Sequence, residues 1–176
     1  PIKTNKKDNL FLHIGRNDAR KNFKFALEVF KELDIPNKKL IKIGNLSKEE
    51  RGIIEANKLN VEIINSVSDK KLKEIYNKSD ILLFPSKYEG LGLPPLEAMA
   101  SGCPVIAANN TGLKEVCLKE SLIELNKEKW IKEIYKILNN KNYKNSIIKK
   151  GFKKAKAFNW KNYSLEVEKI IKNKLK

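Results

Sequence analysis

A glycine-rich loop between two short apolar runs, within the segment 84–116, sets the topology that this chain can adopt. The run Asp80–Phe84 is uncharged after its first residue and predicts a buried strand. Pro85 ends that strand. Gly90 and Gly92 then allow unusual backbone dihedral angles and a close approach of the backbone to another group. We therefore expect a tight loop at the carboxyl end of a buried strand.

A short helix and a second strand are expected after this loop. Pro94 and Pro95 fit a first helical turn, and the helix is predicted from Leu96 to about Ala100, where Gly102–Pro104 ends it. Val105–Ala107 predicts the next buried strand. A strand, a loop, a helix and a strand in this order form a βαβ unit. Since anionic ligands bind at the loop of such units, we expect an anion site here.

Two carboxylates, Glu89 and Glu97, stand in this unit. The pattern P-S-x-x-E-G-x-G-x-P-x-L-E-A-M-A-x-G-x-P-V-I-A, residues 85–107, resembles the donor-sugar signature of glycosyltransferase family 4. Members of this family are retaining enzymes of the GT-B fold that use nucleotide sugars. The resemblance implies that Glu97 binds the ribose hydroxyls and that Glu89 is a catalytic residue that orients the donor sugar. The amides at the helix start are expected to contact the donor, and they belong to Gly90, Leu91, Gly92 and Leu93.

The first predicted strand, Leu10–Ile14, ends in a second candidate anion site. Gly15 follows the strand, and Arg16 and Lys21 precede an amphipathic helix that begins near Phe23. Cations and backbone donors at this position can hold a diphosphate. The family resemblance extends to this G-R…R-K-N stretch, and it implies that Arg16 and Lys21 bind the phosphates of the donor.

The rest of the chain alternates between strands and helices. After the third predicted strand, Val61–Ile64, the resemblance places Val67 and Ser68 beside the nucleobase. The alternative for Ser68 is a helix N-cap without a ligand role. The other expected elements are strands at Leu40–Ile43 and Leu122–Ile123, a helix opened by a capping box at Ser47, and three terminal helices with inward residues Trp130, Ile131, Ile134 and Leu138, then Ile147, Ile148 and Phe152, then Leu165, Ile170 and Ile171.

Composition limits the function classes. The formal net charge of +16 invites a polyanion partner, but the lysines are scattered and fall mostly on predicted helices, where solvated faces explain them. We expect no nucleic-acid partner, and a peripheral contact with an anionic membrane stays open. No apolar run approaches the roughly 20 residues that span a bilayer, and no signal peptide precedes Leu10. The expected location is therefore the cytoplasm, with peripheral contact at the inner membrane face left open.

Neither metal nor cofactor chemistry is expected. Cys103 and Cys117 lie outside any C-x-x-C or histidine-rich context, so we interpret them as reduced thiols. His13, the only histidine, alternates with Leu12 and Ile14 in a strand and is interpreted as a core or strand-edge residue. The chain contains no D-x-D pair, which argues against a bridging divalent metal.

These observations predict one α/β domain, a Rossmann-like three-layer fold with a mostly parallel sheet. We expect residues 1–9 to be a linker and residues 10–176 to be the donor nucleotide-sugar-binding domain. The resemblance implies the carboxyl-terminal half of a GT-B enzyme. The amino-terminal half is expected on a longer chain, of which this sequence is a fragment, or on a partner chain.

The implied function is transfer of a hexose from a nucleotide diphosphate sugar to a glycan or lipid acceptor, with the isolated domain inactive. A sugar phosphorylase or sugar-phosphate synthase on the same fold stays open. The alternative from another class is a non-catalytic basic module that binds a polyanion or docks a partner chain. Paired carboxylates also occur in glycosidases, but a cationic phosphate cradle has no use in plain hydrolysis.

Overall fold

The computed structural model describes residues 9–158, 168 and 171–172, and it contains a six-stranded sheet. The strand order is β3-β2-β1-β4-β5-β6, and all neighbouring strands are parallel. The strands are β1 (Asn9–Ile14), β2 (Lys38–Ile43), β3 (Val61–Ile64), β4 (Ile81–Phe84), β5 (Val105–Ala108) and β6 (Leu122–Ile123).

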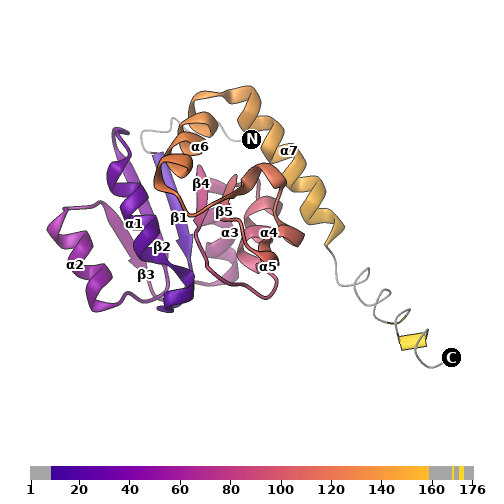
Figure 1. Ribbon diagram of the computed structural model, residues 1–176, viewed down its shortest axis with the longest axis horizontal. Coiled ribbons are helices and arrows are strands. Elements are labelled where there is room, and N and C mark those ends of the chain that lie inside the picture. Colours follow the sequence, from indigo (N-terminus) through magenta and orange to yellow (C-terminus); the bar gives the residue numbers. More distant parts are fainter. Residues whose placement is uncertain (1–8, 159–167, 169–170, 173–176) are drawn as a thin grey trace.

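Helices connect these strands and cover both faces of the sheet (Figure 1). They are η1 (Ala19–Lys21), α1 (Phe23–Glu32), α2 (Lys48–Ala56), α3 (Asp69–Lys78), α4 (Leu93–Ala100), α5 (Thr111–Val116), η2 (Lys119–Ser121), α6 (Lys127–Asn139) and α7 (Lys141–Ala157). In the described part of the chain, every helix is too short or too polar to span a bilayer.

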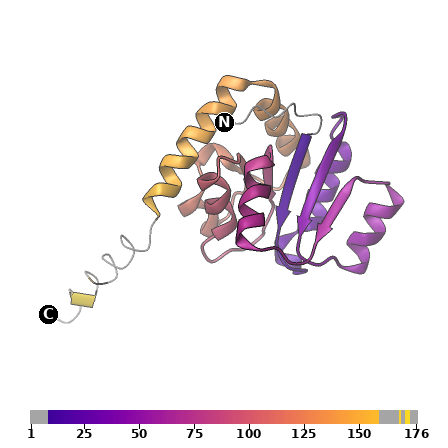
Figure 2. The same ribbon diagram turned by 180° about the vertical axis from the view of Figure 1, so that it is seen from behind.

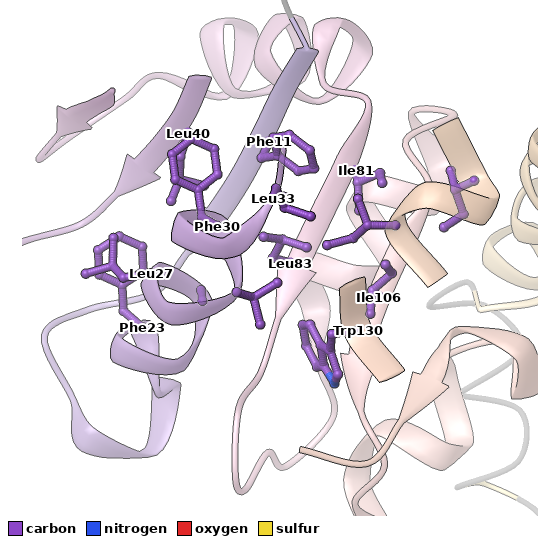
Figure 3. Close-up of a cluster of buried hydrophobic side chains, with 14 of the residues drawn as sticks. Phe11, Phe23, Leu27, Phe30, Leu33, Leu40, Ile81, Leu83, Ile106 and Trp130 are labelled. Atoms are coloured by element: carbon purple, nitrogen blue, oxygen red, sulfur yellow. The ribbon is translucent and has the colours of Figure 1, made fainter. Parts of the chain in front are cut away.

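One face of the sheet packs against α1 and α6. Figure 3 shows Phe23, Leu27 and Phe30 of α1 lying over the strands, with Trp130 of α6 beside them. The strands present alternate residues to this face, because successive side chains of a strand point to opposite sides. These residues are Phe11, Leu40, Ile81, Leu83, Ile106 and Ala108.

The intervening strand residues face the other layer, which consists of α3, α4 and α5. Leu82 and Phe84 of β4 belong to this second cluster, and Tyr76 and Met99 contribute to it from the helices. Both faces of the sheet are thus covered, which explains why its strands are apolar on both sides. The predicted three-layer α/β fold is confirmed.

The predicted elements agree with the structure except at some boundaries and at two side chains. Ile171 was expected to point inward but is 51% exposed. Helix α4 begins at Leu93 rather than Leu96, because Gly92 has a φ of 90° and lets the chain turn directly into the helix. Phe152 was expected to point inward but is 46% exposed. The contact face of α7 passes instead through Ile147 and Gly151, which are buried. Of the last expected helix, Leu165 and Ile170 lie outside the described residues.

Replacing Gly52 by alanine is expected to stabilise the domain by about 0.5–1 kcal/mol. Gly52 lies inside α2, has no left-handed φ, and has no atom within 4 Å of the position that a Cβ would take. Chemical denaturation measures the change. Gly151→Ala is the matched control in α7, since its Cβ would lie 3.2 Å from Cγ of Met99. An equal gain in both variants would contradict the steric argument.

Candidate functional site

The predicted site residues lie at the carboxyl ends of the strands, along one edge of the sheet. In Figure 2 the arrowheads of the indigo and purple strands point down toward this edge. Strands β1 and β4 are neighbours, but the chain leaves β1 for α1 on one face and β4 for α4 on the other. A strand order that reverses in this way creates a crevice where ligands bind in open α/β sheets.

The loop after β1 presents two basic side chains. Gly15 packs against Lys21, and a Cβ on Gly15 would lie only 2.8 Å from Cγ of Lys21. Arg16 is exposed and makes no ion pair within the described residues. Arg20, in contrast, donates to Asp18 at 2.5 Å, and its guanidinium lowers the pKa of that carboxyl to about 2. Within the described residues, Arg16 is therefore the cation of this loop that is left without an ion pair.

Lys21 and Glu89 form an ion pair that joins the two predicted motifs. The Nζ of Lys21 lies 2.6 Å from Oε1 of Glu89, although the residues are 68 positions apart in the sequence. Their side chains are 23% and 11% exposed. A lysine ammonium has three N–H donors. Glu89 uses one of them, so the others remain for a second acceptor in the crevice.

Neighbouring segments hold the loop after β4 in place. From the β1 side, Lys87 donates its amide to the carbonyl of Arg20 at 2.8 Å, and Asn22 donates to the carbonyl of Pro85 at 3.3 Å. From the β5 side, Asn110 donates to the carbonyl of Ser86 at 2.6 Å. A residue with a Cβ would not fit at Gly112, because that atom would lie 2.0 Å from the carbonyl oxygen of Glu89.

The start of α4 supplies the backbone donors that the sequence indicates. Gly92 is buried against α5, where a Cβ would lie 2.7 Å from Cδ2 of Leu113. Gly90, Leu91 and Leu93 are exposed. Pro94 and Pro95 carry no N–H, so the backbone donors at this end of α4 are the amides of Leu93 and of the glycine-rich loop before it.

Glu97 is oriented by Tyr76, a residue that the sequence analysis did not assign to the site. The Tyr76 hydroxyl, from α3, donates to Oε2 of Glu97 at 2.9 Å. Burial, together with the charge of Glu97, raises the pKa of Tyr76, so the hydroxyl stays protonated and remains a donor. One oxygen of Glu97 is thus fixed, while its other oxygen is free to accept a hydrogen bond from a ligand.

Val67 and Ser68 lie after β3 on the same sheet edge, with β2 between β3 and β1. The Ser68 side chain accepts from the amide of Lys71 and caps α3, as the alternative interpretation predicted. Val67 packs against the second core cluster. Neither residue contacts the Lys21–Glu89 pair, so a nucleobase contact for them stays a prediction.

His13, Cys103 and Cys117 are buried, as expected. Burial is the main cause that lowers the pKa of His13 well below its ordinary value, so the imidazole is neutral near pH 7 and is not poised as a general base. Burial also raises the pKa of the Cys117 thiol to about 12. Within the described residues, no three His, Cys, Asp or Glu side chains are placed to hold a metal ion.

The fold and the site define a doubly wound α/β domain with the basic residues Arg16 and Lys21 at the switch point of its strand order. The chain belongs to the family of glycosyl transferases group 1, whose model matches residues 1–154. It is similar to an uncharacterized glycosyltransferase of Methanocaldococcus jannaschii, with 29% identity over 92% of this chain and 47% of the relative. It is also 31% identical to O-antigen chain mannosyltransferase B of Escherichia coli, over 86% of this chain and 42% of that protein.

Solved structures share the fold. The sucrose-phosphate synthase of Thermosynechococcus elongatus matches with a TM-score of 0.81 and 25% identity over 96% of this chain and 46% of that one. The carboxyl-terminal domain of a group 1 glycosyl transferase of Francisella tularensis matches with a TM-score of 0.73 and 21% identity over 85% of each chain. The fold is therefore that of the carboxyl-terminal domain of GT-B glycosyltransferases. The chain spans less than half the length of the two curated relatives.

Proposed function

We propose that this domain binds the nucleoside diphosphate sugar of a retaining glycosyltransferase that transfers a hexose to a glycan or lipid acceptor. The observation that carries the proposal is the ion pair between Lys21 and Glu89 at 2.6 Å. It brings the candidate phosphate-binding cation next to the candidate sugar-orienting carboxylate, in the crevice between β1 and β4.

Each part of the donor has a matching group in this proposal. Arg16, Lys21 and the start of α4 oppose the negative charge that develops on the leaving diphosphate. Glu97 accepts hydrogen bonds from the ribose hydroxyls through the oxygen that Tyr76 leaves free. Glu89 orients the sugar near its anomeric carbon. These cationic side chains and amides supply the charge stabilisation in a chain without a D-x-D pair.

The relatives support a hexose donor. Two of them are named O-antigen chain mannosyltransferases, from Escherichia coli and Salmonella typhimurium. A solved relative in Anabaena, HepE, was determined with UDP and glucose. We propose that the acceptor binds to a second domain, on a longer chain or a partner chain. Free, buried cysteines fit a reducing compartment, so we place the domain in the cytoplasm.

Calorimetric titration with UDP, GDP and ADP, without metal, tests the proposal. We expect one nucleotide to bind, and we expect Arg16→Ala and Lys21→Ala each to weaken that binding about tenfold, because each removes one charge-assisted contact. Lys24→Ala is the matched control, since Lys24 pairs with Glu49 on the exposed surface. Unchanged affinity in both Arg16→Ala and Lys21→Ala would refute the phosphate assignment.

A second candidate function is that of a basic module without catalysis. Helix α7, Lys141–Ala157, favours it because seven of its residues are lysines and none is acidic. Such a helix matches the charge of an anionic bilayer at the inner membrane face. Salt-dependent sedimentation with phosphatidylglycerol vesicles, unaffected by nucleoside diphosphates and without nucleotide binding, would favour this second function. Nucleotide binding favours the first.

A further inference from the structure

A lysine lies inside the domain, beneath the loop that follows β1. Lys42 lies between Ile41 and Ile43 in strand β2 and is fully buried. Its ammonium donates to the carbonyl of Gly15 at 2.5 Å and lies 4.9 Å from the ring centroid of Phe23. No ion pair involves it within the described residues. Because burying a charge without a counter-ion costs free energy, packing alone does not explain a lysine here.

His13 lies beside the same aromatic ring. Its imidazole is buried and its centroid is 4.6 Å from that of Phe23. The Nε2 atom lies 3.2 Å from the carbonyl oxygen of Lys21. Since a carbonyl oxygen only accepts, Nε2 carries the proton of the neutral ring and donates it. Lys42 also donates to the carbonyl of Ile43 at 3.5 Å. From the core, Lys42 and His13 thus hold the backbone carbonyls of Gly15 and Lys21.

The two carbonyls belong to the two ends of one loop, Gly15–Lys21. The Gly15 carbonyl is also packed tightly against Gly44, where a Cβ would lie 2.1 Å from that oxygen. Between the ends, the amides of Arg16 and Asn17 make no hydrogen bond within the described part of the chain. The interior thus holds the carbonyl oxygens of Gly15 and Lys21, while Arg16 and Asn17 between them are exposed.

We propose that His13 and Lys42 are positioning residues, which hold the loop Gly15–Lys21 in the shape that receives a diphosphate. This inference rests on the proposed function. A carbonyl oxygen that pointed toward the ligand would repel a phosphate oxygen. When these carbonyls point into the core instead, the phosphate contacts the cations of the loop. An apolar residue at either position would fill the same space without the cost of a buried polar group.

The first test measures the loop in the ligand-free protein. Lys42→Met and His13→Phe keep the approximate volume and the contact with Phe23 but remove the hydrogen-bond donor. We expect amide hydrogen exchange in residues 15–21 to become about tenfold faster in each variant, which corresponds to the loss of one hydrogen bond. Lys48→Met, at an exposed lysine of α2, is the control. Unchanged exchange in both core variants would overturn the inference.

The second test compares a nucleoside diphosphate with the nucleoside alone, using the base that binds best. Each core variant should lose about tenfold in affinity for the diphosphate and nothing for the nucleoside. His13→Gln keeps an N–H donor and should recover most of the loss. Equal losses for both ligands, or no loss, would overturn the inference.

Failure of the proposed function gives a different result from failure of this inference. If the wild-type domain binds no nucleoside diphosphate, the proposed function is wrong. The proposal that His13 and Lys42 shape the loop for a diphosphate is then wrong as well. The exchange measurement still decides whether His13 and Lys42 hold the loop. If the wild type binds and the variants bind equally well, the inference alone is wrong.

Discussion

Replacing Glu97 by alanine is expected to weaken binding of the nucleoside diphosphate about tenfold to a hundredfold, because a hydrogen bond to a charged group contributes about 1.5–3 kcal/mol. The Tyr76 hydroxyl fixes one oxygen of Glu97 at 2.9 Å and leaves the other for the ribose. Calorimetric titration of the wild type and the variant measures the change. The same factor should be lost for the nucleoside alone, since the ribose is common to both ligands.

Three further variants separate this contact from its neighbours. Tyr76→Phe keeps the carboxylate but frees its second oxygen, so we expect a loss of only a few-fold. Glu97→Gln keeps the shape without the charge and should give an intermediate loss. Lys21→Ala should weaken binding of the nucleoside diphosphate and leave binding of the nucleoside unchanged. If Glu97→Ala binds both ligands as the wild type does, Glu97 does not contact the ribose.

The fold was predictable because its strands are short and apolar and its turns carry strong local signals. Gly102 ends α4, and Ser47 opens α2 with the expected capping box. Val61–Ile64 is a strand at the expected bounds. The strands face apolar layers on both sides, so each run of Ile, Leu and Val indicates burial without fixing the partner strand. The errors concern boundaries and two side chains, Ile171 and Phe152. For Phe152, packing of α7 against α4 decides which residues face inward.

Site residues could be predicted only where they belong to a sequence motif. Lys21 and Glu89 were each assigned to the donor, but nothing local in the sequence indicates that they form an ion pair. Tyr76 was missed because its contact with Glu97 joins two helices, α3 and α4, whose packing depends on the sheet. For Lys42 the sequence offers a local signal, a charged residue between Ile41 and Ile43 in the apolar end of a strand.

Replacing Lys42 by methionine is expected to stabilise the domain by about 2 kcal/mol at pH 7. Burial lowers the pKa of Lys42 from 10.5 to about 8, although Glu50 partly opposes the shift. A difference of this size corresponds to about 3 kcal/mol of destabilisation while the lysine is charged in both folded and unfolded states. The hydrogen bond to the Gly15 carbonyl that the variant loses offsets about 1 kcal/mol.

The pH dependence of this gain identifies its cause. Between pH 8 and 10.5 the unfolded chain binds more protons at Lys42 than the folded protein does, so wild-type stability rises with pH in that window. The advantage of Lys42→Met should be complete below pH 8 and should disappear before pH 10.5, because the lost hydrogen bond still costs the variant about 1 kcal/mol when the lysine is neutral. Lys21, Glu50 and His13 also face this ammonium, and Lys42 itself contributes to lowering the pKa of His13. The denaturation curves are therefore compared above pH 8, where His13 is neutral in both proteins.

A variant that is more stable yet binds the diphosphate more weakly would show that Lys42 is retained for the loop and not for the fold. Natural proteins keep destabilising residues where function requires them. Chemical denaturation of wild type, Lys42→Met and the exposed control Lys48→Met between pH 6 and 10 measures the stability difference, and the control should show no change with pH. If Lys42→Met is less stable than the wild type at pH 7, the buried ammonium stabilises the core. The claim that burial of this charge destabilises the domain would then be wrong.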